Sequence, residues 1–238
     1  MPYPIDIAGI PIENQFLAAL PVADLERILP KLEKVELTYG TTIYDRGEPI
    51  QYVYFPTGCI LSMVAVGPDG LALEMGIVGR EGMVGLPVFL GDDLADCRVI
   101  VQEDGSAMRM TAADFEFECR NNKTLRQRLV LFARLRLVQA TLASACHRVH
   151  DVEQQLVRWL LMTSDRMQNS EIPVTSEFLS LILGLTRDKA AKAILTLKKR
   201  DLIGYKDDRF LILDRPKLLA AACRCYTIIR NEEMSIAA

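Results

Sequence analysis

The chain has 238 residues, half of them hydrophobic, which is enough to bury one large core or two smaller ones. An ordinary charged fraction of 25% excludes a disordered chain, and a net charge of −3 excludes a uniformly basic nucleic-acid coat. The charge is uneven: residues 1–146 hold 13 basic and 19 acidic side chains, whereas residues 147–238 hold 15 basic and 12 acidic ones. The C-terminal part is therefore the part that we expect to meet a polyanion.

The sequence favours a cytoplasmic protein without membrane contact. Its first residues lack the basic and apolar regions of a signal peptide. The longest uncharged stretch, residues 50–68, is interrupted by Pro56-Thr57-Gly58, which favours two strands and a turn over a membrane helix. In that compartment we expect reduced, buried thiols. The cysteines stand at positions 59, 97, 119, 146, 223 and 225.

The N-terminal part changes its periodicity once. Residues 13–38 carry leucine and isoleucine at helical spacing and are expected to form short helices. From Tyr39 short apolar runs alternate with turn residues, and Gly67-Pro-Asp-Gly70 is a strong turn signal. The expected strands are residues 52–55, 59–66, 71–78, 98–102 and 107–110. Many short strands with glycine-rich turns indicate a β-sandwich or barrel within residues 1–120.

A long helix is expected next, over residues 121–147, after a shorter helix that Thr111 can cap. Its apolar residues step by four and three, as in the a/d seam of a coiled coil. This seam consists of Leu131, Leu135, Val138, Leu142 and Ala145. Arginines at 126, 128, 134 and 136 flank it as solvated residues would, so we expect a homodimer interface. The alternative is that the helix packs only on its own sheet.

Residues 148–238 contain two helical patterns separated by one glycine. Thr175 or Ser176 can cap the first helix, Gly184 can end it, and Thr186 can cap a second helix that runs from Arg187 to about Arg200. The inner face of the second helix is expected to hold Ala190, Ala191, Ile194 and Leu197. A helix, a glycine turn and a helix of this size indicate a helix-turn-helix, whose second helix enters the DNA major groove.

The outer face of the second helix opens with residues that can read DNA. The fork of Arg187 can bond guanine, and Asp188 can accept from cytosine or orient Arg187. Two strands follow, with a hairpin tip over residues 206–209, which makes the motif a winged helix-turn-helix. The predicted DNA contacts are Thr186, Arg187, Asp188, Lys189, Lys192, Lys206 and Arg209.

A β-roll, a long helix and a C-terminal winged helix-turn-helix, in that order, resemble the Crp/Fnr family of bacterial transcription regulators. The resemblance covers nearly the whole chain, and its most specific segments are "EGMVGLPVFLG", "ACHRVHDVEQQLVRWLLM" and "VTSEFLSLILGLTRDKAAKAILTLKKRDLIGY". It implies an α+β fold with an N-terminal antiparallel β-roll (a jelly-roll or double-stranded β-helix) and flanking helices. It also implies a dimer on palindromic double-stranded DNA, with RNA polymerase as a further partner. The family's Arg-Glu-x-x-x-Arg reading set falls here on Arg187, Asp188 and Lys192.

The resemblance also implies an effector pocket in the front domain, which we place at Glu81, Gly82, Asp96 and Arg98. The family's phosphate-binding Arg-Ser/Thr-Ala segment falls on Ala95-Asp96-Cys97, where an aspartate would repel a phosphate. Arg98 would point to the other side of its strand from Cys97. We therefore expect no cyclic nucleotide. The input is another small ligand or none, and in the second case the regulator is constitutive.

No cofactor or metal is expected. Other members of the family carry an iron–sulfur cluster on N-terminal cysteines, but the first cysteine here is Cys59. Cys223-x-Cys225 alone is too small a set for a closed metal site, and both cysteines are expected to pack between helices. His147 and His150 are the only possible histidine ligands for haem. We expect them to make hinge contacts, with a ligand or pH-sensing role as the alternative.

Two other classes of function compete with a DNA-binding regulator. A β-barrel metalloenzyme would need histidines inside the roll, and residues 1–146 contain none. No nucleophile–base pair is evident either, so we expect no enzyme activity. The remaining alternative is a ligand-binding or protein-interaction module whose helix-turn-helix only packs, without specific DNA binding. A weak salt dependence of DNA binding would favour that alternative.

Overall fold

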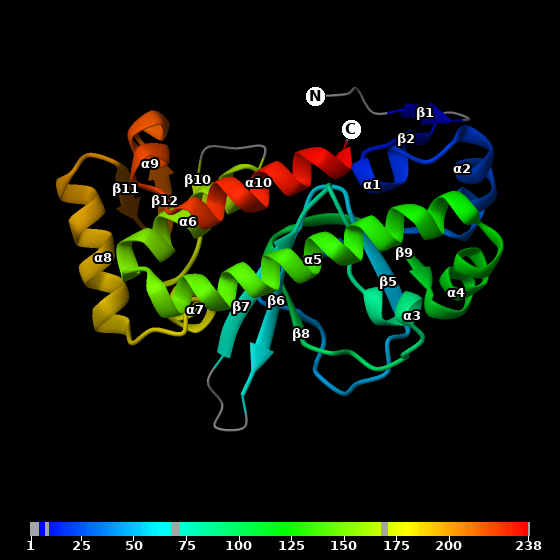
Figure 1. Ribbon diagram of the computed structural model, residues 1–238, viewed down its shortest axis with the longest axis horizontal. Coiled ribbons are helices and arrows are strands. Elements are labelled where there is room, and N and C mark those ends of the chain that lie inside the picture. Colours follow the sequence, from blue (N-terminus) through cyan, green and yellow to red (C-terminus); the bar gives the residue numbers. More distant parts are fainter. Residues whose placement is uncertain (1–4, 8–9, 68–71, 168–170, 238) are drawn as a thin grey trace. The chain divides into compact units, whose positions relative to one another are not determined.

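The computed structural model describes residues 5–7, 10–67, 72–167 and 171–237 (Figure 1). The chain forms two compact units. The first comprises residues 1–63, 78–137 and 233–238, and the second comprises residues 64–77 and 138–232. The fold class is the expected α+β arrangement of antiparallel sheets, a long helix and a C-terminal helix-turn-helix.

The N-terminal half of the chain is rich in short antiparallel strands. Its elements are β1 (Ile5–Ile7), β2 (Ile10–Ile12), α1 (Gln15–Ala18), α2 (Val22–Ile28), η1 (Leu29–Lys31), β3 (Glu33–Leu37), β4 (Thr42–Tyr44), β5 (Tyr52–Pro56), β6 (Ile60–Val66), β7 (Ala72–Val78), α3 (Leu86–Leu90), β8 (Arg98–Glu103), β9 (Gly105–Thr111) and α4 (Ala112–Asn121). Two sheets have the strand orders β3-β9-β5 and β4-β8-β6-β7. The expected strands are therefore present over the described residues, and β5 and β6 stand within the long uncharged stretch instead of a membrane helix. Residues 68–70 of the expected Gly67–Gly70 turn lie outside the described residues.

One expectation for this half is wrong. Residues 33–37, the end of the segment expected to be helical, form strand β3. This strand pairs with β9 over five residues, with Val35 opposite Ala107. A ladder of backbone hydrogen bonds to a distant strand thus outweighs the weak local preference for a helix.

The core of the first unit is aromatic at its centre. The ring of Phe16 lies 6.3 Å from that of Phe55 and 5.6 Å from that of Phe132, between centroids. Phe115 of α4 packs edge-on against Phe55 at 6.2 Å. These separations are in the range of favourable aromatic pairs. Because Phe132 belongs to α5 (Lys123–Val149), the core fixes the first half of the long helix on the roll.

Helix α5 is long and apolar enough to cross a membrane by length and composition. However, Leu125, Leu129, Phe132 and Leu135 are all buried in the core of the first unit. Their spacing of four and three residues is that of an amphipathic helix that covers a core. The alternative that this helix packs on its own sheet therefore holds for its N-terminal half.

The second unit contains the winged helix-turn-helix. Its elements after α5 are α6 (Val152–Ser164), β10 (Glu171–Pro173), α7 (Ser176–Ile182), α8 (Arg187–Lys199), β11 (Ile203–Lys206), β12 (Arg209–Ile212), α9 (Arg215–Ala221) and α10 (Arg224–Ala237). The three strands are ordered β10-β12-β11. Strand β10 is not among the strands that the sequence predicted. Its three residues pair with β12, so the wing has one more strand than expected.

Candidate nucleic-acid interface

The residues around the turn between α7 and α8 explain where each helix begins and ends. The Thr175 hydroxyl accepts a hydrogen bond from the backbone N–H of Phe178 at 3.1 Å, which caps α7. Gly184, at φ +58°, takes the left-handed conformation that ends a helix at little cost. Thr186 is the N-cap residue of α8, but its hydroxyl caps no backbone N–H of the described chain. That hydroxyl remains available to a phosphate oxygen.

Helix α8 buries one stripe and exposes the opposite one. The buried residues are Ala190, Ala193, Ile194 and Leu197. Ala191, which the sequence placed on the inner face, is exposed, and Ala193 takes its place. At 100° per residue, the direction opposite the buried stripe is that of Asp188, Lys192 and Leu195. All three are exposed, with Leu195 at 55%.

Sequence reasoning did not find Leu195 or Ala191 as candidate DNA contacts. The signal was present, because Ala193 continues the buried 3.6-residue period better than Ala191 does. Small and apolar side chains on this face can make apolar contact with the methyl group of thymine in the major groove. The exposed face of α8 therefore combines charged groups for hydrogen bonds with an apolar contact.

Arg187 is held by a partner that the sequence did not indicate. Its Nη1 lies 3.1 Å from Oε1 of Glu177 in the first turn of α7. Hydrogen bonds from the backbone N–H of Glu177 and from Ser176, followed by the charge of Arg187, hold the pKa of this carboxyl below its usual range. The sequence had offered Asp188 as the residue that orients Arg187.

The wing ends in the predicted tip. Lys206 pairs with Arg209 across β11 and β12, and Asp207 and Asp208 both have a φ near +50°, as in a type I′ hairpin turn. Lys206 lies 3.7 Å from Asp207, and Arg209 lies 3.7 Å from Glu171 of β10. Both predicted phosphate contacts thus have acidic neighbours, and a phosphate would have to compete with them.

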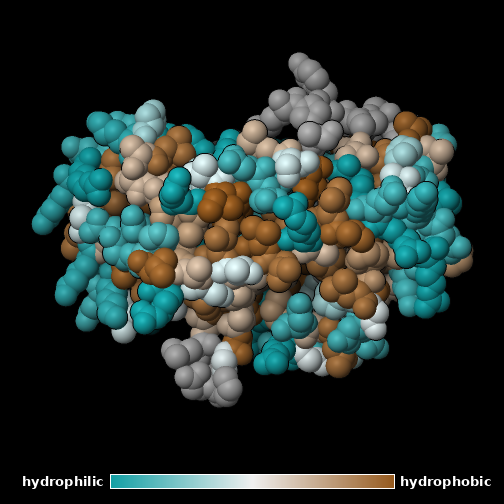
Figure 2. Space-filling model, viewed as in Figure 1, coloured by the Kyte–Doolittle hydropathy of each residue, from teal (hydrophilic) through white to brown (hydrophobic). Residues whose placement is uncertain are grey.

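The predicted dimer residues of α5 do not all share one environment. Leu131 and Ala145 are exposed, Val138 and Leu142 are half-buried, and Leu135 is buried in the core of the first unit. Three apolar residues of α5 outside the predicted seam are more exposed than Leu131, which is 44% exposed: Val130 at 58%, Leu137 at 69% and Val149 at 70%. Arg136, expected to be solvated, is buried and donates to the sulfur of Met63. Figure 2, which has the same viewing direction as Figure 1, shows hydrophobic side chains along α5.

The predicted effector residues have structural partners. The Glu81 carboxylate accepts from the backbone N–H of Gly79 at 3.1 Å. Arg98 makes an ion pair with Asp45, and its hydrogen bond lowers the pKa of Asp45. Asp96 is exposed.

Gly82 has a packing role. A Cβ atom at this position would lie 2.5 Å from Cε2 of Phe132. The glycine is therefore needed for the close approach of the buried Phe132 ring. No phosphate is required to explain its presence.

A pocket of about 350 Å³ opens elsewhere on the first unit, and Tyr44, Glu48 and Tyr54 are among its lining residues. None of the four predicted effector residues lines it, and its described lining contains no lysine or arginine. It therefore suits an uncharged or cationic ligand better than a phosphate.

Two domain descriptions match the sequence. Residues 34–122 match the cyclic nucleotide-binding domain, and residues 154–221 match the Crp-like helix-turn-helix domain. No relative among curated protein sequences matches the chain.

Several solved structures share the fold. FixK2 from Bradyrhizobium japonicum is 15% identical, with a TM-score of 0.66 over 81% of this chain and 98% of its own. The c-di-GMP responsive global regulator CLP of Xanthomonas campestris is 17% identical, with a TM-score of 0.65 over 82% of this chain and 100% of its own. A CRP family transcriptional regulator from Thermus thermophilus is 17% identical, with a TM-score of 0.58 over 79% of this chain and 96% of its own.

Proposed function

Because the chain belongs to the Crp/Fnr family of transcription regulators, we propose that α8 reads base edges in the DNA major groove through Arg187, Asp188 and Lys192. DNA-binding transcription regulation follows from the Crp-like helix-turn-helix domain. The observation that carries the assignment of Asp188 and Lys192 is the solvent-facing stripe of α8, which lies opposite its buried stripe. Arg187 is assigned because it is exposed at the first position of α8 and is held by Glu177. Leu195 lies about one turn after Lys192 and extends the stripe of α8 that we propose to face the bases.

The proposed active form is a homodimer in the cytoplasm, without enzyme activity. Two copies of α8 would then enter successive major grooves, about 34–36 Å apart, on a palindromic site. The exposed apolar side chains of α5 support this arrangement. They face solvent in the described single chain, and the α5 helix of a second copy would bury them. A regulator bound at a promoter in this way would act on RNA polymerase.

The input to the front domain is proposed to be something other than a cyclic nucleotide, or nothing. Asp96 stands where the family's phosphate donors fall, and Arg98 is already neutralised by Asp45. We also propose that the protein needs no haem and no iron–sulfur cluster. A thermal shift assay with cyclic AMP, cyclic GMP and c-di-GMP tests the first point, and a shift with any of the three would contradict it.

Fluorescence anisotropy tests the function itself. The purified protein, without added ligand, is titrated onto DNA from upstream of its own gene and onto a scrambled duplex at several salt concentrations. Tight, salt-sensitive and selective binding is expected, since phosphate contacts make affinity fall with salt. Binding that is weak, insensitive to salt and equal on both duplexes would instead support a module that does not bind specific DNA.

A further inference from the structure

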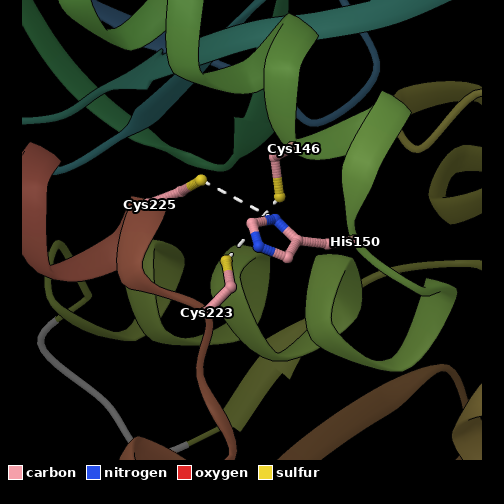
Figure 3. A group of neighbouring side chains, drawn as sticks. All are labelled: Cys146, His150, Cys223 and Cys225. Atoms are coloured by element: carbon pink, nitrogen blue, oxygen red, sulfur yellow. Dashed lines mark hydrogen bonds between the residues drawn. The ribbon is translucent and has the colours of Figure 1, made fainter.

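Four potential metal ligands from two distant segments meet in the second unit (Figure 3). Cys146 lies in the last turn of α5, and His150 follows that helix directly. Cys223 precedes α10, and Cys225 lies in its first turn. The four ligand atoms, three sulfurs and one imidazole nitrogen, all lie within 4.8 Å of one another. The three cysteines are buried and His150 is half-buried.

The distances within this group fit a tetrahedral ion. Zn–S bonds of about 2.3 Å place two sulfurs about 3.8 Å apart, and a Zn–N bond of about 2.05 Å places a sulfur and a nitrogen about 3.6 Å apart. In the structure, the sulfurs of Cys146 and Cys223 are 3.7 Å apart. The Cys225 sulfur lies 3.8 Å from Nδ1 of His150. From this geometry we propose that Cys146, His150, Cys223 and Cys225 bind one structural zinc ion.

A buried cation lies beside the group. Arg158 of α6 is only 3% exposed, and its Nε has no hydrogen-bond partner among the described residues. Its charge acts on both Cys146 and Cys225. Three thiolates, one neutral imidazole and Zn²⁺ carry a net charge of −1. The zinc site would therefore supply the negative charge that a buried guanidinium needs.

The backbone around His150 is also fixed. The N–H of His150 donates to the carbonyl of Cys146 at 3.0 Å, which keeps these two ligands one turn apart. The side-chain amide of Gln155 donates to the carbonyl of His150 at 2.9 Å. Such outer contacts orient ligands before the metal binds.

A disulfide, an iron–sulfur cluster and plain thiol packing each fit this group less well than zinc does. A disulfide needs sulfurs about 2.05 Å apart, and all six cysteines are free in the structure. An iron–sulfur cluster inserts several iron and sulfide atoms between its thiolates, which the close approach of these sulfurs does not allow. Plain packing would need only the separate contacts of Cys146 with Cys223 and of Cys225 with His150, whereas all four ligand atoms lie within 4.8 Å of one another. A closed set of three cysteines and one histidine is a known structural zinc type.

The ion would join segments that are far apart in sequence. Cys146 and Cys223 are separated by 77 positions, and the chain between them contains α6 to α9 with the helix-turn-helix. A metal clip that closes so long a loop removes much conformational freedom from the unfolded chain. The proposed zinc thus stabilises the fold of the DNA-binding unit by fixing the start of α10 to the end of α5.

Metal analysis of the full chain, purified under reducing conditions, tests the proposal. Mass spectrometry should find about one zinc per chain in the wild type. Cys146→Ser and Cys223→Ser should lose this zinc. Cys119→Ser, which removes a buried cysteine of α4 outside the group, should keep it. Zinc retained in both of the first two variants would overturn the proposal, as would iron with acid-labile sulfide in place of zinc.

A second measurement decides the matter if the serine variants fail to fold. Wild-type protein freed of metal by a chelator is titrated with Co²⁺ under anaerobic, reducing conditions. A tetrahedral thiolate site should give strong thiolate-to-cobalt absorption that saturates at one equivalent and disappears when Zn²⁺ is added. Metal removal should also lower the melting temperature, and Zn²⁺ should restore it. Absence of the cobalt absorption, together with an unchanged melting temperature, would show that the group is only packed thiols.

Discussion

Nη1 of Arg187, the first residue of α8, lies 3.1 Å from Oε1 of Glu177 in the first turn of α7. The pair connects the two helices of the helix-turn-helix on their exposed side, where both side chains are more than half exposed. An exposed ion pair contributes little to stability. We expect the pair instead to orient the guanidinium before DNA binds.

Arg187→Ala should reduce specific affinity by about 1–3 kcal/mol if the guanidinium reads a base. Glu177→Gln should raise the affinity for any duplex, because it removes a negative charge beside the proposed DNA-binding helix. It should also lower the preference for the specific duplex, since Arg187 is no longer oriented. Anisotropy titrations of both variants on specific and scrambled duplexes measure these effects. An unchanged ratio of the two affinities in Arg187→Ala would remove this residue from the reading set.

Leu195→Asn should weaken DNA binding without unfolding the protein. The side chain is 55% exposed, so its replacement costs little stability. Leu197→Ala is the contrasting variant, because Leu197 is fully buried and its truncation should cost about 2–5 kcal/mol of stability. Denaturant unfolding and anisotropy, measured on both variants, separate the two roles. Equal DNA affinity of Leu195→Asn and the wild type would mean that this part of α8 does not contact the bases.

Leu137→Glu should convert the proposed dimer to a monomer. The side chain is 69% exposed on α5, and a partner helix would bury the new carboxylate without a counter-charge. Leu90→Glu, at a residue of α3 that is 65% exposed, is the matched control and should stay dimeric. Sedimentation velocity distinguishes the two states. A dimeric Leu137→Glu variant would place the interface elsewhere.

Gly82→Ala should destabilise the first unit by about 1–3 kcal/mol, because overpacking of a well-filled core carries such a cost. The new Cβ would meet the Phe132 ring at 2.5 Å. Gly204→Ala is a matched glycine control, since its Cβ would meet Leu211 at an ordinary 3.6 Å. Thermal unfolding of the two variants gives the comparison. An unchanged melting temperature in Gly82→Ala would show that this glycine is not needed for the packing of Phe132.

Protonation of Asp45 should destabilise the first unit in acid. The hydrogen bond from Arg98 lowers the pKa of Asp45 in the folded protein. Its stabilisation is therefore present above the usual aspartate pKa and is lost as the pH falls through the lowered folded value. Asp45→Asn should remove this contribution and flatten the acid side of a stability-against-pH curve. The same curve for wild type and variant would show that the ion pair has no measurable effect.

The sequence by itself determined what depends on neighbours along the chain. Capping threonines, the left-handed glycine at 184 and the 3.6-residue period located α7 and α8 within a residue or two. The hairpin tip at Asp207 and Asp208 also followed from local turn chemistry. These features are fixed by backbone sterics and short-range hydrogen bonds, which act over about one helical turn.

The tertiary structure decided what depends on distant partners. Residues 33–37 are a strand because β9 lies beside them, and Leu135 is buried because the aromatic core of the first unit lies beneath that part of α5. Cys146 and His150 suggest only a helix end, and Cys223 and Cys225 suggest only two packed thiols. Folding over more than 70 positions brings the four together, and no periodicity along the chain records that distance.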